Sequence, residues 1–108
     1  MASLKPSVIV AGVDFGTQSV RVSIVDSVAG VLGGGVIEYP VIRRRDDPDF
    51  ATQPHETHMK ALVEAMALAL ADAGVSGAAI KSIAVDTTGS TVVPVGEGLA
   101  DRRLLPLV

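Results

Sequence analysis

The sequence has no cysteine, and aromatic residues make up only 3% of the chain. Without cysteine the protein can form neither a disulfide nor a thiolate-bound metal site, and nothing asks for an oxidising compartment, so the cytoplasm is the expected location. His55 and His58 have no third ligand at a useful spacing and are expected on the surface. With so few rings, the core must come from Val, Ile, Leu, Ala and Met, which favours a Val/Ile-rich sheet covered by an Ala/Leu-rich helix.

The sequence also lacks the features of a secreted, membrane-bound or nucleic-acid-binding protein. Residues 1–6 have no charged start followed by a long apolar stretch. The apolar run at residues 8–13 is far shorter than the roughly 20 residues that span a bilayer. The net charge of −3 offers no attraction to phosphate backbones, and the arginines at 43–45 precede acidic residues, as in a solvated loop. We therefore expect neither a nucleic acid nor a membrane as partner.

Short apolar runs separated by turn residues predict a sheet. Residues Val8–Val13 are continuously apolar, as in a strand buried on both faces, and end at Asp14. Residues Val20–Asp26 partly alternate, which is typical of a strand that returns beside the first in a hairpin. Glycines 33–35 weaken the third strand or admit the close approach of another backbone. The predicted strands span residues 8–13, 20–26, 31–42, 80–85 and 91–95.

One helix is predicted between the third and fourth strands. Residues 43–53 are polar and acidic and form a loop, with Thr52 or Gln53 as the helix cap and Pro54 in the first turn. Gly74 is expected to end the helix. Apolar residues at intervals of three and four form one stripe that is expected to face the core: Met59, Leu62, Val63, Met66, Leu70 and Ala73.

Two loops of similar composition follow two of the predicted strands. Residues 13–19 and 85–91 both run from an apolar strand through an aspartate to Gly, Thr and Ser. A crossover through the helix would make the two strands parallel neighbours, which brings Asp14 and Asp86 to the carboxyl edge where α/β sheets bind ligands. Carboxylate oxygens suit Mg²⁺, while amides and hydroxyls suit phosphate. We interpret the loops as two walls of one site; an ordinary hairpin turn, or an aspartate capping its own turn, is the alternative.

The first loop belongs to a longer pattern, Asp-Phe-Gly-Thr-Gln-Ser-Val-Arg at residues 14–21. It is neither a P-loop nor a dinucleotide fingerprint. It resembles the first phosphate motif of the FGGY carbohydrate kinases, which belong to the actin and hexokinase superfamily. Residues 85–91, followed by Pro94, are similar to the corresponding loop of L-ribulokinases, and Gln53-Pro54 fits the family pattern before the helix. The resemblance covers about residues 8–95 in matching order and spacing.

The resemblance implies a role for each loop. Asp14 would order magnesium through water, and Arg21 would hold the hairpin or the phosphates. The residues expected around the phosphates of ATP are Asp14, Gly16, Thr17, Gln18, Ser19 and Arg21. The residues expected to border the sugar are Asp86, Thr87, Thr88, Gly89 and Ser90. ATP and Mg²⁺ are thus the expected cofactors, and a ketopentose resembling L-ribulose is the expected substrate.

The resemblance also implies a fold and a domain organisation. The fold would be α/β, a ribonuclease H-like mixed sheet of the actin/hexokinase type, with strand order 3-2-1-4-5 and strand 2 antiparallel. Residues 1–7 would form an N-terminal tail, and residues 8–108 a partial sugar- and phosphate-binding domain, truncated at its C-terminal end. The general base and the adenosine-binding domain are expected beyond Val108, so no catalytic residue is assigned within the chain, which alone is expected to be inactive.

Other readings of the same residues stay open. The substrate could equally be another sugar of the family, such as D-ribulose, xylulose or glycerol. A non-catalytic nucleotide-binding module of the actin-like superfamily would also use the first loop, but it would have no special reason to carry the second. A plain structural fragment with an exposed sheet edge is the third reading. Whether a longer parent is a homodimer is also left open.

Overall fold

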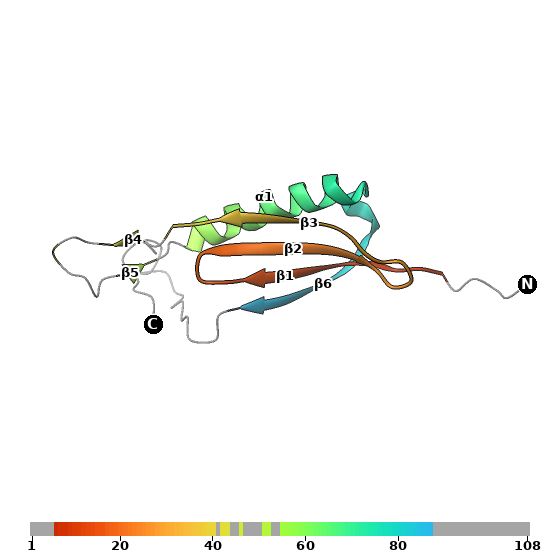
Figure 1. The fold of residues 1–108 in the computed structure, drawn as a ribbon, viewed down its shortest axis with the longest axis horizontal. Helices are drawn as coiled ribbons and strands as arrows, with labels where there is room; N and C mark the ends of the chain where they lie inside the picture. The colour runs from red at the N-terminus through yellow and green to blue at the C-terminus, as the bar shows by residue number, and fades with distance from the viewer. Residues whose placement is uncertain (1–5, 41, 44–45, 47–50, 53–54, 88–108) are drawn as a thin grey trace, which may run out of the picture.

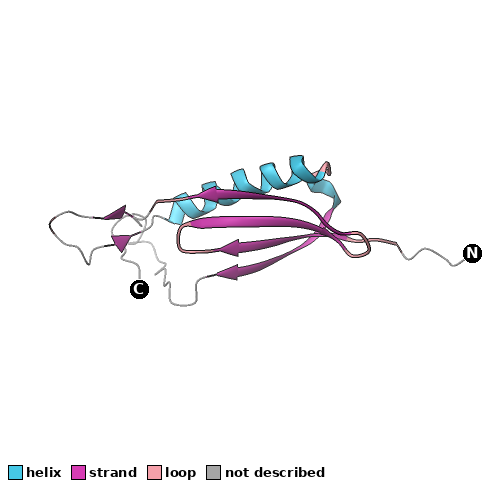
Figure 2. Ribbon diagram, viewed as in Figure 1, coloured by secondary structure: helices cyan, strands magenta, loops and turns pink. Residues whose placement is uncertain are grey.

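A computed structural model describes residues 6–40, 42–43, 46, 51–52 and 55–87, and in this part of the chain one helix lies on a mixed sheet (Figures 1 and 2). The strands are β1 (Ile9–Phe15), β2 (Ser19–Asp26), β3 (Gly30–Glu38), β4 (Ile42–Arg43), β5 (Ala51–Thr52) and β6 (Ile80–Thr87). The helix α1 spans His55–Ala73, and a short 3-10 helix at Gly77–Ala79 leads into β6.

The main sheet has the strand order β3-β2-β1-β6. β2 is antiparallel to both β1 and β3, whereas β6 is parallel to β1. These four strands correspond to the first four predicted strands, in the predicted order 3-2-1-4 and with the second strand antiparallel. The predicted fifth strand, at residues 91–95, lies outside the described residues, so the complete order 3-2-1-4-5 stays a prediction.

The core lies between the sheet and α1, and β2 is its centre. Val20, Val22 and Ile24 of β2 are completely buried, and Ala11 and Val13 of β1 lie beside them. The intervening residues of both strands are less buried, so β1 is covered on one face only. Its continuous apolar run had predicted burial on both faces, and that prediction is wrong. The reason is that α1 packs against one side of β2 and β3, and no other described helix covers the opposite side (Figure 1).

The turn between β2 and β3 is fixed by a buried carboxylate. Asp26 accepts hydrogen bonds from the backbone amides of Val28 at 2.7 Å and Ala29 at 3.0 Å. The Ala29 bond and then the Val28 bond hold the pKa of Asp26 below its ordinary value, because both stabilise the ionised form. Gly30 completes the turn with a φ of +86°, a conformation that glycine adopts without strain.

α1 approaches the sheet through its smallest side chains. Ala61, Ala65 and Ala69, four residues apart, are its buried residues. They face the glycines of β3 so closely that a Cβ at Gly35 would lie 2.6 Å from the carbonyl oxygen of Ala65, and one at Gly33 would lie 2.5 Å from the amide nitrogen of Ala73. The close backbone approach suggested by the run of glycines is therefore present.

This alanine contact changes which side of the helix is buried. Of the predicted stripe, Leu62, Met66, Leu70 and Ala73 are partly buried at its side. Met59 and Val63 are wrong as core residues, because 44% and 67% of their surfaces are exposed. Large side chains at the centre of the contact would hold the helix away from β3, so the alanines occupy it and the larger residues pack around it.

Both ends of α1 bear on the sequence predictions. The C-terminal end is confirmed: Gly74 has a φ of +70°, its amide donates to Ala71, and Val75 donates to Leu70, both at 3.2 Å, which forms a Schellman motif. The Asp72 carboxylate also accepts a 3.0 Å hydrogen bond from the amide of Gly34, which ties this end to β3. At the N-terminal end the helix begins at His55, and Gln53 and Pro54 lie outside the described residues.

The segment between β3 and α1 is not entirely loop. β3 ends at Glu38, four residues before the predicted end at 42, and Ile42–Arg43 and Ala51–Thr52 pair as the antiparallel strands β4 and β5. Thr52 therefore belongs to a strand, which contradicts its prediction as the helix cap. Two residues in each strand give too weak a pattern to be recognised in the sequence.

The alanine–glycine contact yields a stability prediction. Gly35→Ala should lower the free energy of unfolding by about 1–3 kcal/mol, because the new methyl group would overlap the backbone of α1. Gly12→Ala is the matched control, since a Cβ there meets no atom within 4 Å and should cause no loss. Urea unfolding of both variants tests this, and an equal loss in the two would contradict the close contact.

Candidate functional site

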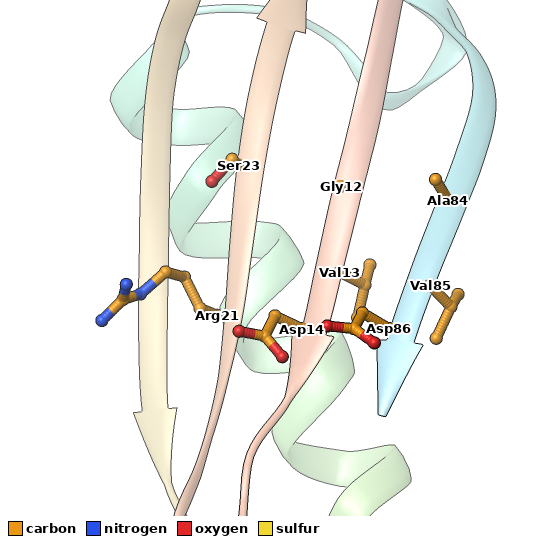
Figure 3. A pocket seen from close by; sticks show the side chains of 8 residues that line it. All are labelled: Gly12, Val13, Asp14, Arg21, Ser23, Ala84, Val85 and Asp86. Carbon is orange, nitrogen blue, oxygen red and sulfur yellow. The ribbon is translucent and has the colours of Figure 1, made fainter. Parts of the chain in front are cut away.

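The face of the sheet away from α1 carries a groove of about 400 Å³ at the ends of β1 and β6 (Figure 3). Because side chains alternate along a strand, the residues that point to this face are those between the buried ones. Six lining residues follow this alternation: Gly12, Asp14, Arg21, Ser23, Ala84 and Asp86. Val13 and Val85, which alternate with them, also border the groove. β1, β2 and β6 all contribute to it.

Strand register arranges these side chains in two rows across the sheet. In the first row Gly12 pairs with Ser23 of β2 and with Ala84 of β6. All three residues are small, and this leaves room above the sheet. The row therefore forms the floor of the groove.

The second row carries charge. Asp14 pairs with Arg21 on one side and with Asp86 on the other. In Figure 3 the carboxylates of Asp14 and Asp86 lie side by side at the ends of their strands, whereas the Arg21 side chain extends toward β3. All three residues are exposed, so a bound ligand can reach them. The expected meeting of Asp14 and Asp86 at one edge of the sheet is thus confirmed by the register.

The structure brings most of the predicted phosphate residues together. Asp14 and Arg21 line the groove, and Gly16 to Ser19 connect their strands in a tight turn. The Gly16 amide donates to the carbonyl of Ser19 at 2.8 Å, and a Cβ at Gly16 would lie 3.3 Å from that oxygen, tighter than most such contacts. The small residue at this position therefore keeps the turn compact.

The structure describes only two of the residues predicted to border the sugar. Asp86 lines the groove, and Thr87 ends β6 as the register partner of Phe15. Thr88, Gly89 and Ser90 lie outside the described residues, so their position relative to the groove stays a prediction.

Tyr39, just after β3, contacts the turn and was not identified from the sequence. Its hydroxyl donates to the carbonyl of Gly16, and its backbone amide donates to the carbonyl of Gln18 at 2.9 Å. Burial first, and then the charge of Asp14, raise the pKa of Tyr39, which keeps the hydroxyl protonated and able to donate. Tyr39 is the one tyrosine of the sequence, and that rarity was the only signal. The small residues Gly12, Ser23 and Ala84 were missed too, although each lies two positions from a predicted charged residue.

His58 corrects the expectation that both histidines lie on the surface. Its ring packs edge-on against Tyr39 with centroids 4.7 Å apart, and against Phe15 at 6.3 Å. Desolvation by this packing, and secondarily the charge of His55, lower the pKa of His58. No pattern in the sequence indicates this contact, because it depends on how α1 is placed over the end of the sheet.

The described side chains suit a water-bound magnesium ion better than a fully protein-bound metal. Among them, no three or more His, Cys, Asp or Glu residues gather closely enough to hold a metal ion. The groove nevertheless offers the carboxylates of Asp14 and Asp86 on neighbouring strands. Mg²⁺ commonly keeps several waters and takes one or two carboxylates in addition to substrate phosphates, so this donor set fits it.

Comparison with known families identifies the class of protein as a sugar kinase. Residues 9–106 match the model of the N-terminal domain of the FGGY family of carbohydrate kinases. The match spans nearly the whole sequence, and the chain therefore belongs to the FGGY family. Kinases of this family use ATP, generally with Mg²⁺. No curated protein matches the chain.

The described helix shows no sign of crossing a membrane. Among the residues that the structure describes, no helix combines the length and the apolar content that a span through the bilayer requires.

The packing of His58 predicts how stability depends on pH. Its lowered pKa means that the unfolded chain binds a proton more readily than the folded one. The contribution of His58 should therefore be complete above its unfolded pKa, about 6.5, and should be lost as the pH falls from there through the lower folded pKa. The urea midpoint of unfolding, measured between pH 5 and 8, should therefore fall as the pH falls below about 6.5. His58→Phe should reduce this dependence of the midpoint on pH.

His55→Gln is the control for this experiment. This variant removes only the secondary cause of the lowered pKa of His58. It should keep most of the dependence of the urea midpoint on pH, because burial is the larger cause. An unchanged slope in His58→Phe would show that another group is responsible.

Proposed function

We propose that this protein contributes to ATP-dependent phosphorylation of a ketopentose that resembles L-ribulose. The observation that carries the proposal is the register pairing of Asp14 with Asp86. It puts the end of β1, which leads into the turn that resembles a phosphate motif, beside the end of β6, where the residues that resemble a ribulokinase sugar motif begin. Phosphoryl transfer requires the donor phosphate and the acceptor hydroxyl to be held together in line, so adjacent strand ends suit the reaction.

The turn side of the groove would receive the phosphates of ATP. Asp14 would hold Mg²⁺ through water, with its exposed carboxylate at the carboxyl end of β1. Gly16, Thr17, Gln18 and Ser19 would surround the transferred phosphate with amides and hydroxyls, and Arg21 would add a guanidinium that suits phosphate oxygens. Bound Mg-ATP supplies the phosphoryl group and the metal charge that offsets its oxygens.

The β6 side of the groove would receive the sugar. Asp86 is an exposed acceptor for sugar hydroxyls, and Thr87 follows it at the strand end. Thr88, Gly89 and Ser90 would continue this wall by their resemblance to the family loop. The small floor residues leave the groove at a volume within the range of pockets that take small molecules, about 300–1,000 Å³.

The sugar preference can be tested with Mg-ATP and a panel of four acceptors: L-ribulose, D-ribulose, D-xylulose and glycerol. The intact protein should phosphorylate L-ribulose with the highest kcat/KM. Preference for another sugar would keep the kinase class and overturn the ketopentose assignment. ATP binding without phosphorylation of any sugar would favour a non-catalytic nucleotide-binding module.

The role of Asp14 gives a kinetic prediction. Asp14→Asn should lower kcat by roughly a hundredfold, because it removes a charge that positions the metal, while the KM for the sugar stays within about twofold. Steady-state kinetics with the sugar and Mg-ATP varied separately would measure both.

Glu64→Gln is the matched control, because Glu64 is an exposed carboxylate on α1 away from the groove. It should leave kcat and both KM values as in the unaltered protein. An Asp14→Asn variant that loses sugar binding in proportion to kcat would move Asp14 to the sugar side and overturn its assignment.

A further inference from the structure

The turn between β1 and β2 is held by a residue that belongs to neither strand. Tyr39 contacts it twice: the hydroxyl donates to the Gly16 carbonyl, and the backbone amide donates to the Gln18 carbonyl at 2.9 Å. Only 3% of the Tyr39 surface is exposed. A buried side chain with a bonded hydroxyl has little freedom, so it fixes the direction of the Gly16 carbonyl, while the backbone of Tyr39 fixes that of Gln18.

These two hydrogen bonds also set the direction of the turn's amides. In a planar trans peptide the carbonyl of one residue and the N–H of the next point in opposite directions. With the Gly16 carbonyl turned toward the Tyr39 hydroxyl, the N–H of Thr17 points away from it. The ring of Tyr39 lies on the helix side of the sheet, where it meets His58 of α1. The Gln18 carbonyl is held by the backbone amide of Tyr39, one step beyond the Ser19–Glu38 pair of β2 and β3, so this second bond lies along the sheet.

This orientation matters for a phosphate ligand. Carbonyl oxygens carry partial negative charge and repel phosphate oxygens, whereas amide hydrogens attract them. A short turn free to rotate its peptides would present both kinds of group. Because Tyr39 takes up two of the carbonyls, the turn keeps them away from a ligand that approaches from the other side.

We infer that Tyr39 is a positioning residue, which fixes the peptides of the Gly16–Ser19 turn so that the turn receives the phosphates of the nucleotide. This inference rests on the proposed function, in which the turn binds phosphate. Tyr39 does not touch the reacting groups in this arrangement and acts through the backbone of Gly16 and Gln18.

The tyrosine ring is in turn held by α1. The ring of His58 crosses it edge-on at an interplanar angle of 71° and contacts Phe15, the last residue of β1, in the same way at 70°. Edge-to-face contacts of this kind restrict the rings to one arrangement. The rings of His58 and Tyr39 thereby connect the N-terminal end of α1 to the Gly16–Ser19 turn.

Tyr39→Phe tests the inference, because it keeps the ring and removes only the hydroxyl. In the intact protein the Kd for Mg-ATP, measured by calorimetry, should rise about three- to tenfold, which is the range of one lost hydrogen bond. The KM for the sugar should stay within about twofold. Hydrogen exchange at the Gly16 amide should become faster by a similar factor, since that amide bonds within the turn.

Ile37→Val is the matched control, two residues before Tyr39 on β3. Ile37 packs against the core, and its hydrocarbon side chain can make no hydrogen bond to the turn. This variant should bind Mg-ATP as the unaltered protein does. An equal loss of Mg-ATP affinity in the two variants would mean general loosening and would overturn the inference, as would unchanged affinity in Tyr39→Phe.

The same measurements separate this inference from the proposed function. If the unaltered protein binds Mg-ATP and Tyr39→Phe weakens that binding, but no sugar is phosphorylated, then the positioning role stands and the kinase proposal fails. If sugar is phosphorylated and Tyr39→Phe binds Mg-ATP unchanged, the kinase proposal stands and the positioning role fails. An unaltered protein that binds no Mg-ATP would overturn both.

Discussion

The near contact between the backbones of α1 and β3 is the constraint on which the rest of the described structure depends. Three alanines of the helix face a strand that has no side chains at Gly33 and Gly35. The helix can therefore lie lower on the sheet than larger residues would permit. Because α1 is fixed at this height, its first turns bring His58 within reach of Tyr39. The core and the turn are thus linked through one helix.

The two faces of the sheet differ in the side chains that they carry. On the helix side, completely buried valine and isoleucine side chains of β2 hold the strands together. On the other side, a row of small residues leaves a hollow, and a row of charged residues borders it. Phosphoryl transfer draws mainly on alignment and on charge stabilisation, and both can be supplied by side chains that a rigid sheet holds in register.

The sequence predicted those parts that rest on local patterns. Apolar runs and turn residues located the four strands of the main sheet, and Gly74 marked the end of the helix. The position of Asp14 and Asp86 at one edge of the sheet followed from the crossover through the helix, whereas their direct pairing was seen only in the strand register. The buried side of α1 was partly wrong, since periodicity gives weight to large residues such as Met59 and Val63 and not to the alanines. Tyr39 and His58 could not be found, because their contact joins segments that only the packing of α1 brings together.

The alternation of buried and exposed residues along β1 also protects the site against misalignment. A slip of one residue turns every side chain of a strand to the opposite face of its sheet. Such a slip in β1 would expose Val13 and place Asp14 among the buried valines of β2. An ionised carboxylate without a partner in such surroundings costs on the order of several kcal/mol. The apolar core thereby selects the register in which Asp14, Arg21 and Asp86 stand in one row.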